Sequence, residues 1–284
     1  MSVQKKVAAI HDISCVGRCS LTVALPIISA LGIETSILPT AVLSTHTGGF
    51  EGFTYRDLTE DIKPIYEHWK SLGLKFDALY SGFLGSFAQI DLVAQMFDEF
   101  KTKDNVILVD PVCADNGVLY AIYSKEMVKG MAKLCSKADI IIPNITEAVF
   151  MLEKEYKDGP YTKEYIEDIL HSLAKLGPNK VVLTGVWFDN DKLGAAAYDN
   201  GVISYSLMDR IEGYYHGTGD VFGSSLLAAY MSGLSLEEST KVAVEYTHLC
   251  IRMTADADLE RRYGVCFEKA LPWLIERLSV SESL

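Results

Sequence analysis

The most informative part of this sequence is residues 216–233, HGTGDVFGSSLLAAYMSG, because small and apolar residues follow an aspartate and two glycines. This composition predicts a buried helix that begins near Asp220. The first turn of such a helix combines free N–H groups with the positive end of the helix dipole, so it favours an anion. Gly217 and Gly219 would let the backbone approach a phosphate closely. We therefore interpret Gly217, Thr218 and Gly219 as an anion hole.

Asp220 is the unusual member of this stretch. A carboxylate within an anion site repels the anion, unless its task is to accept a proton from a nucleophile that attacks the anion. Asp220 is therefore predicted to be a catalytic base. In the alternative interpretation it only caps the helix, and the glycines form a turn. The glycine spacing does not fit a GxGxxG dinucleotide fingerprint, and no GxxxxGK[ST] motif occurs.

Upstream of this stretch, short apolar runs alternate with longer amphipathic segments. Continuous apolar runs are typical of parallel strands that are buried on both faces. Their alternation with helices predicts an α/β fold with a doubly wound, mostly parallel sheet flanked by helices. Strands are expected at 6–10, 35–38, 78–81, 106–109, 139–142 and 180–183, and helices at 20–31, 58–72, 87–101, 125–137, 165–176, 221–231, 236–253 and 267–278.

The pattern changes after residue 184. Two apolar runs, 195–198 and 202–205, are separated by Asp199-Asn200-Gly201, which is typical of a tight hairpin turn. The sequence has no low-complexity segment, no proline-rich linker and no repeat of fixed period. We therefore expect one domain over residues 1–284, with a small hairpin near 195–205.

The overall composition limits the partners of this chain. A net charge of −12 argues against a nucleic-acid partner, because such proteins need basic surface. No apolar segment reaches the roughly 18 residues of a membrane span, and the short apolar run near the N-terminus fits a first strand better than a signal peptide. The six cysteines are scattered without metal-binding spacing, which favours reduced thiols in a cytoplasmic protein.

Polar residues and glycines follow the predicted strands. In an open parallel sheet, ligands bind beyond the carboxyl ends of the strands. We therefore expect a ligand site where these residues meet. They are His11-Asp12, Ser81-Gly82, Asp110-Pro111, Pro143-Asn144 and Thr184-Gly185.

Two of these strand ends carry carboxylates. The loop from Asp110 through Asp115 to Gly117 could hold a cation by oxygen ligands or meet a polar substrate, or it could be an ordinary turn. Asn144 and Glu147 are three residues apart at a helix start. They could order water around a magnesium ion, or they could form a capping box.

These features, Asp-Pro-Val with Asp-Asn-Gly, then Pro-Asn-x-x-Glu, then Gly-Thr-Gly-Asp, occur in the order seen in the ribokinase-like superfamily. Within that superfamily the chain resembles the vitamin B6 kinases (pyridoxal/pyridoxamine kinase) over nearly its whole length. Residues 44–48, Ser-Thr-His-Thr-Gly, and residues 80–86, Tyr-Ser-Gly-Phe-Leu-Gly-Ser, are similar to the segments of that family near its substrate.

The resemblance implies ATP-dependent phosphorylation of a small-molecule 5′-hydroxymethyl group with Mg²⁺, and it permits a homodimer. Asp220 would be the base, and Gly217–Gly219 would be the anion hole. Asp110 and Glu147 would lie near the metal. The nucleotide would contact Asn144, Thr184, Tyr205 and Met208, and the pyridine ring would contact Asp12, His46, Thr47, Gly48, Phe83 and Asp115.

Asp12 bears on the choice of substrate. It follows the first predicted strand, so its carboxylate is expected at the same edge as Asp220. There it could accept a hydrogen bond from the substrate ring, or it could cap a turn before the first helix. Asp12 is also similar to an aspartate of the hydroxymethylpyrimidine kinases, whose Gly-Gly-Ala-Gly-Ile-Gln run is absent here.

Two alternative functions remain open. One is a hydroxymethylpyrimidine kinase of the same fold. The other is a non-catalytic nucleotide-binding protein, although a binder that had lost catalysis would be free to lose Asp220.

Overall fold

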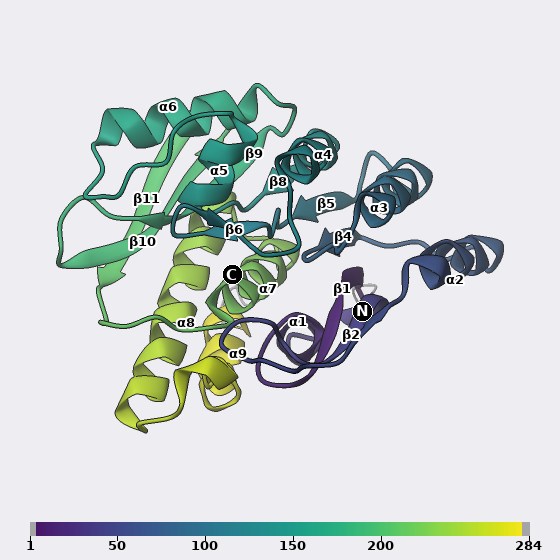
Figure 1. Cartoon of the computed structure of the whole chain (residues 1–284), viewed down its shortest axis with the longest axis horizontal. Coiled ribbons are helices and arrows are strands. Elements are labelled where there is room, and N and C mark those ends of the chain that lie inside the picture. The colour runs from purple at the N-terminus through teal and green to yellow at the C-terminus, as the bar shows by residue number, and fades with distance from the viewer. Residues whose placement is uncertain (1–3, 280–284) are drawn as a thin grey trace.

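A nine-stranded mixed sheet with helices on both faces forms the centre of the computed structural model, which describes residues 4–279 (Figure 1). The outermost residues of the predicted 1–284 domain lie outside that range. The strands are β1 (Lys6–Val16), β2 (Glu34–Thr45), β3 (Tyr55–Asp57), β4 (Ala78–Ser81), β5 (Val106–Val109), β8 (Ile140–Ile141), β9 (Lys180–Val186), β10 (Lys192–Asp199) and β11 (Val202–Asp209). A separate two-stranded hairpin consists of β6 (Ala114–Asp115) and β7 (Val118–Leu119).

The helices connect these strands in chain order and cover both faces of the sheet. They are α1 (Leu21–Ala30), α2 (Thr59–Ser71), α3 (Phe87–Phe100), α4 (Lys125–Cys135), α5 (Ile145–Met151), α6 (Lys163–Ala174), α7 (Thr218–Met231), α8 (Leu236–Asp256) and α9 (Leu271–Ser279). Two short 3₁₀ turns, Arg261–Tyr263 and Glu268–Ala270, precede α9. Among the described residues, no helix is both long enough and apolar enough to cross a membrane.

The strand order is β11-β10-β9-β8-β5-β4-β1-β2-β3. All neighbours from β9 to β2 are parallel, whereas β3 at one edge and the β10–β11 hairpin at the other are antiparallel. Because the order runs outward in one direction from β1 and in the other from β4, the sheet is doubly wound, as the alternating pattern predicts. The hairpin is also confirmed, with Asn200 and Gly201 both at positive φ in its turn.

Alternate residues along the strands supply two separate apolar layers. Leu79 of β4 packs in the layer beneath α2 to α6, whereas Tyr80 packs in the layer that includes α7 and α8. The same alternation holds in β9, where Val181 and Leu183 face one way and Val182 faces the other. Figure 1 shows these two groups of helices on opposite sides of the sheet. The central strands, such as β4 and β5, are therefore buried on both faces, and the residues at their carboxyl ends remain available for chemistry.

The first strand is longer than predicted, and this corrects the place of Asp12. The prediction ended β1 at Ile10, but β1 continues to Val16. Its pairing with β2 shifts register between His11 and Ile13, so Asp12 lies at a bulge within the strand rather than after it. Polar residues in this half of β1 break the apolar run, which is why the sequence pattern stopped early.

Some short elements were not predicted. These are β3 and the β6–β7 hairpin, whose strands have three residues or fewer. For α5 only the start near Asn144 was predicted, not its extent. The helix expected over 267–278 begins only at Leu271, after a 3₁₀ turn. All six cysteines are free thiols in the structure, and four of them are buried.

Candidate active site

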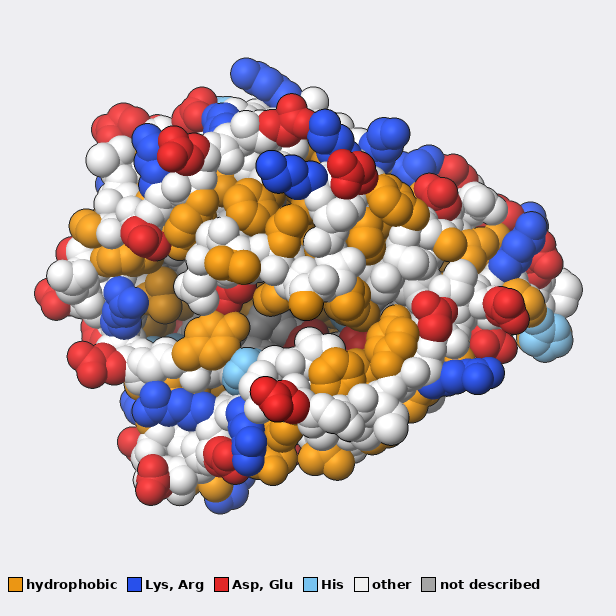
Figure 2. Space-filling view, viewed as in Figure 1, with side chains coloured by type: hydrophobic (Ala, Val, Ile, Leu, Met, Phe, Trp, Pro, Cys, Tyr) orange, Lys and Arg blue, Asp and Glu red, His pale blue; other side chains and the backbone are white. Residues whose placement is uncertain are grey.

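The carboxyl ends of the parallel strands bring the predicted residues to one edge of the sheet. Ile10 of β1 pairs with Ser81 of β4, and Ser81 pairs with Val109 of β5. Asp110 therefore follows β5 at the same level, and a further bridge joins Asn144 to Thr184. Figure 2 shows a hollow near the middle of this view, with acidic side chains in its depth and apolar side chains on its rim. The expectation of a shared edge is thus fulfilled for these residues.

The N-terminus of α7 points its free amides into this edge. Gly217 occupies the N-cap position in the left-handed conformation, with φ of 74°, and no side chain caps the helix. The hydroxyl of Thr218 is turned back to the carbonyl of Tyr215, at 3.2 Å. The first-turn N–H groups of Thr218, Gly219 and Asp220 therefore lack intrahelical acceptors and remain available to an anion.

Asp220 lies in the first turn of α7 in a mostly buried environment. Burial raises the pKa of its carboxyl to about 6, and the nearby charge of Asp12 adds to this rise. A hydrogen bond from the backbone N–H of Ser20 and the adjacent thiol of Cys19 act in the opposite direction. The carboxylate is therefore ionised at neutral pH and remains basic enough to accept a proton.

Asp12 is buried beside Asp220 and is itself held by hydroxyl groups. Ser20 donates to its Oδ1 at 2.6 Å, and Ser14 donates to its Oδ2 at 3.1 Å. Burial raises the pKa of Asp12 in spite of these two bonds. Asp12 thus fixes the start of α1 and also presents a carboxylate at the same edge as Asp220.

The carboxylate of Glu147 is held in place by backbone N–H groups. Its Oε2 accepts the N–H of Asn144 at 2.9 Å, and the side chain of Asn144 accepts the N–H of Glu147 at 2.9 Å, which completes a capping box. Its Oε1 accepts the N–H of Cys113 at 3.1 Å. The amide nitrogen of Asn144 donates to the carbonyl of Ala114 at 2.8 Å, so this side chain is used within the protein. Burial raises the pKa of Glu147 to about 8.

Asp110 differs from Glu147 because no donor among the described residues reaches its carboxylate. Burial raises its pKa well above the ordinary value, and the charges of Glu147 and Asp220 raise it further. A Cβ atom placed on Gly219 would lie 4.0 Å from its Oδ2, so Asp110 faces the anion hole. A buried carboxylate with acidic neighbours and no donor suits a hard cation such as Mg²⁺, which takes few protein ligands and several waters. Within residues 4–279, no three His, Cys, Asp or Glu side chains form a ready-made metal site.

His46 is fixed in one neutral tautomer. Its Nδ1 accepts the N–H of Gly48 at 3.1 Å, so its Nε2 carries the proton and donates to the carbonyl of Arg262 at 2.6 Å. Burial lowers the pKa of this imidazole, which favours the neutral form. Gly48 lies so close to His216 that a Cβ would meet its ring at 2.6 Å. Thr47, which lies between His46 and Gly48 in the sequence, is exposed.

Phe83 lies in the loop after β4, and Asp115 lies in β6. The ring of Phe83 is partly buried and packs edge-on against Tyr123, with centroids 6.1 Å apart. Asp115 accepts the hydroxyl of Tyr214 at 2.9 Å, which joins the β6–β7 hairpin to the loop before α7. Tyr214 had no role in the sequence analysis, and its position 99 residues from Asp115 left no local signal.

The predicted nucleotide contacts are not all brought together. Thr184 lies at the end of β9 beside Pro143, at the expected edge. Tyr205, however, packs in the layer under α6, where it donates to Glu167 at 3.0 Å. Met208 packs in the opposite layer. Because alternate strand residues face opposite ways, the side chains of Tyr205 and Met208 lie on opposite faces of the sheet.

Cys19 and Ser20 are the contacts of Asp220 that the sequence analysis missed. They lie in the loop between β1 and α1, and Ser20 is the N-cap of α1 with φ of 54°. Its hydroxyl does not cap α1 and instead donates to Asp12. The available signal was a polar residue directly before a predicted helix, which normally indicates a cap and no more.

Comparisons with known proteins agree with this geometry. Residues 25–265 match the phosphomethylpyrimidine kinase family. A crystal structure from Bacteroides thetaiotaomicron VPI-5482 with pyridoxal, of a protein provisionally named phosphomethylpyrimidine kinase, is 39% identical; the match covers 96% of each chain with a TM-score of 0.91. The pyridoxal kinase of Lactobacillus plantarum is 29% identical over 99% of each chain, with a TM-score of 0.89.

A curated relative gives the same result from sequence. The pyridoxal kinase of Dictyostelium discoideum is 25% identical over 265 residues, which cover 85% of this chain and 82% of that protein. The resemblance to ribokinase-like vitamin B6 kinases that the motifs suggested is confirmed by these matches. The chain belongs to the phosphomethylpyrimidine kinase family.

Proposed function

We propose that this chain is an ATP-dependent kinase that phosphorylates the 5′-hydroxymethyl group of a vitamin B6 vitamer, namely pyridoxal, pyridoxamine or pyridoxine. The observation that carries this proposal is the position of Asp220 in the uncapped first turn of α7. A general base and an anion site are thereby adjacent. Phosphoryl transfer to an alcohol needs this pairing, because the alcohol loses a proton while negative charge is carried by the transferred group.

In the proposed reaction, Asp220 accepts the proton of the substrate hydroxyl as its oxygen attacks the γ-phosphorus of ATP. A pKa of about 6 leaves the carboxylate ionised at neutral pH and able to take that proton. The amides of Gly217 to Gly219 and the dipole of α7 stabilise the charge on the phosphoryl oxygens. Asp220 differs from an ordinary capping aspartate because its side chain makes no cap hydrogen bond to α7.

Mg²⁺ would be held at the edge where Asp110 and Glu147 lie. Asp110 is the better candidate for direct contact, since Glu147 already accepts three backbone N–H groups, from Cys113, Ala114 and Asn144. When bound, the ion would neutralise phosphate charge and help to orient the nucleotide. Thr184 lies at the same edge and remains a candidate nucleotide contact, as does the partly buried Tyr205, whose hydroxyl donates to Glu167.

The substrate ring would lie between the 46–48 loop and Phe83. Both ring nitrogens of His46 are used by the backbone, so His46 can offer its face to a ring but no further hydrogen bond. Asp12 is the candidate acceptor for a ring substituent, with Thr47, Gly48 and Asp115 at the rim. The pyridoxal complex of the 39% identical Bacteroides protein supports a B6 vitamer as the ligand.

A hydroxymethylpyrimidine remains the second candidate substrate, because the matching family takes its name from a pyrimidine kinase. A coupled ADP-release assay with pyridoxal, pyridoxamine, pyridoxine and hydroxymethylpyrimidine tests the proposal. We expect the highest kcat/KM with one of the three vitamers. A clearly higher kcat/KM for hydroxymethylpyrimidine would show that the protein is a pyrimidine kinase. No turnover with any of the four compounds would refute kinase activity on this class of alcohol.

A further inference from the structure

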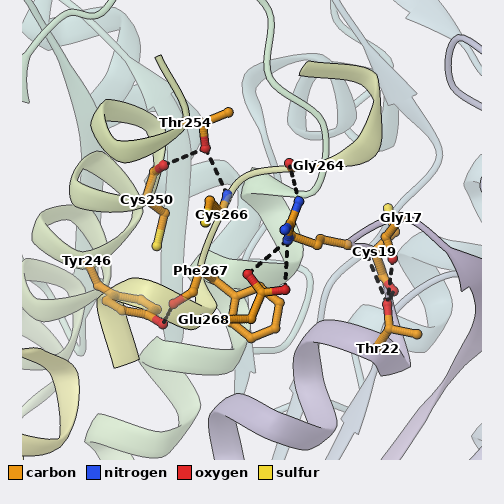
Figure 3. A network of polar contacts seen from close by, with 11 residues as sticks. Gly17, Cys19, Thr22, Tyr246, Cys250, Thr254, Gly264, Cys266, Phe267 and Glu268 are labelled. Atoms are coloured by element: carbon orange, nitrogen blue, oxygen red, sulfur yellow. Dashed lines mark hydrogen bonds and ion pairs between the residues drawn. The ribbon is translucent and has the colours of Figure 1, made fainter. Parts of the chain in front are cut away.

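The loop between β1 and α1 is attached to a segment near the far end of the chain. The guanidinium Nε of Arg18 lies 2.8 Å from both carboxylate oxygens of Glu268, and its Nη1 lies 3.5 Å from the carbonyl of Gly264. The backbone N–H of Arg18 donates to the carbonyl of Tyr263 at 2.9 Å. Figure 3 shows this network around Gly17, Cys19, Gly264 and Glu268. Arg18 is therefore held by both its backbone and its side chain.

The carbonyl of Arg18 also fits between two glycines. A Cβ atom on Gly217 would lie 2.1 Å from this oxygen, and a Cβ atom on Gly264 would lie 2.5 Å from it. Both glycines have positive φ, at 74° and 84°. A further bond from the N–H of Val265 to the carbonyl of His216, at 3.2 Å, joins the same two segments. The anion-hole loop, the β1–α1 loop and the 263–268 segment thus meet at Arg18.

The next two residues in the chain are those that contact the base. The thiol of Cys19 lies against the carboxylate of Asp220, and the backbone N–H of Ser20 donates to it. No side chain caps α1, so the hydrogen bonds of Ser20 go to Asp12 and Asp220. Any shift of the backbone at Arg18 would therefore be passed on directly to the hydrogen bond at Asp220.

We infer that Arg18 is a positioning residue for the phosphoryl transfer: through its ion pair with Glu268 it holds the Cys19–Ser20 backbone against the carboxylate of Asp220. This inference rests on the proposed role of Asp220 as the base. An ion pair as exposed as this one, with side chains 29% and 49% accessible, contributes little to stability. Its effect is on the geometry of one hydrogen bond. Arg18 and Glu268 both lie outside the residues that match the family, 25–265.

The test compares Glu268→Ala with Glu34→Ala. Glu34 forms an ion pair with Lys6 at 3.0 Å and a similar exposure, but at the amino ends of β1 and β2, on the opposite edge of the sheet. The Ser20 N–H lowers the pKa of Asp220, so weakening that bond should raise this pKa. We expect the acidic limb of kcat/KM to move up by about one pH unit in Glu268→Ala and Arg18→Ala, with about a fivefold loss at pH 6 and little loss at pH 8.5. The reversed pair, Arg18→Glu with Glu268→Arg, should restore part of the shift.

A second measurement needs no substrate. The carboxyl carbon of Asp220 is titrated by ¹³C NMR in aspartate-labelled protein, and its signal is identified by its loss in Asp220→Asn. We expect a higher midpoint in Glu268→Ala than in the wild type or Glu34→Ala. Equal midpoints, or a loss of kcat/KM that is uniform over pH, would overturn the inference. If the wild type phosphorylates no B6 vitamer, the proposed function fails, and this titration still decides the role of Arg18.

Discussion

Replacing Asp220 by asparagine should separate catalysis from stability in this protein. The substitution keeps the size of the side chain but removes its capacity to accept a proton. We expect kcat to fall by about 10²- to 10⁴-fold, the usual contribution of a general base. ATP should still bind, because the amides of the α7 first turn remain and one negative charge near the phosphates is lost.

The pH dependence of the wild type follows from the same residue. With a pKa of about 6, Asp220 is about 97% ionised at pH 7.5 and about 9% ionised at pH 5. The rate should therefore fall about tenfold for each pH unit below 6, and Asp220→Asn should lose this limb. A steady-state series from pH 5 to 8.5, at saturating ATP and Mg²⁺, measures both effects.

The stability of Asp220→Asn should increase at neutral and higher pH, although its activity falls. Folding raises the pKa of Asp220 from 3.8 to about 6, so the folded state favours the protonated acid, and that stability is full below pH 4 and is lost as the pH rises through 6. Two units at 1.4 kcal/mol each set an upper limit of about 3 kcal/mol, and partial exposure of the side chain reduces this to about 1–2 kcal/mol. Asp220→Asn should thus raise Tm by a few degrees at pH 8, and by almost nothing at pH 4.

Calorimetry at the two pH values checks this, with Asp98→Asn as an exposed control. A variant that keeps turnover within a few-fold of the wild type would refute the assignment of the base. A variant that is inactive because its Tm has collapsed would show instead that Asp220 is needed for folding.

Three other substitutions have distinct expected results. Gly217→Ala places a Cβ 2.1 Å from the carbonyl of Arg18, so both Tm and kcat/KM should fall, the latter by about tenfold or more; normal values in calorimetry and kinetics would contradict the close approach. Glu147→Gln leaves one side-chain oxygen for the two N–H groups of Cys113 and Asn144, so it should cost about 1–3 kcal/mol, seen in denaturant unfolding, while raising the Mg²⁺ concentration for half-maximal rate. A lower stability with an unchanged Mg²⁺ dependence would restrict Glu147 to a structural role. Asp12→Ala should lower kcat/KM for the vitamer by about 5- to 150-fold without changing the KM for ATP, whereas equal losses on a deoxy analogue would show that Asp12 only supports Ser20.

The sequence was sufficient for the architecture because the strands are buried on both faces. Runs such as Val106–Val109 are apolar throughout, and this property needs no knowledge of tertiary contacts. The second half of β1 was missed for the converse reason. Asp12 and Ser14 interrupt the apolar run, and only the hydroxyl groups that reach Asp12 allow the strand to continue.

The site was predictable where the residues act through local backbone geometry. Gly217 and Asp220 lie within one helical turn, so their proximity can be predicted from four consecutive residues. The contacts of Cys19 with Asp220 and of Tyr214 with Asp115 join positions that are about 200 and 99 residues apart, and no periodicity encodes them. Tyr205 and Met208 lie on one strand, but strand alternation sends their side chains to opposite layers, and this is not visible in the family's sequence pattern.

The pairing of Arg18 with Glu268 has a consequence for protein synthesis. These residues are 250 positions apart, and the sheet that carries Arg18 can begin to form while most of the chain is still being made. Until Glu268 has left the ribosome, the loop beside the base lacks its partner. A nascent chain can therefore contain the whole parallel sheet while the Cys19–Ser20 loop beside Asp220 still lacks the ion pair that holds it.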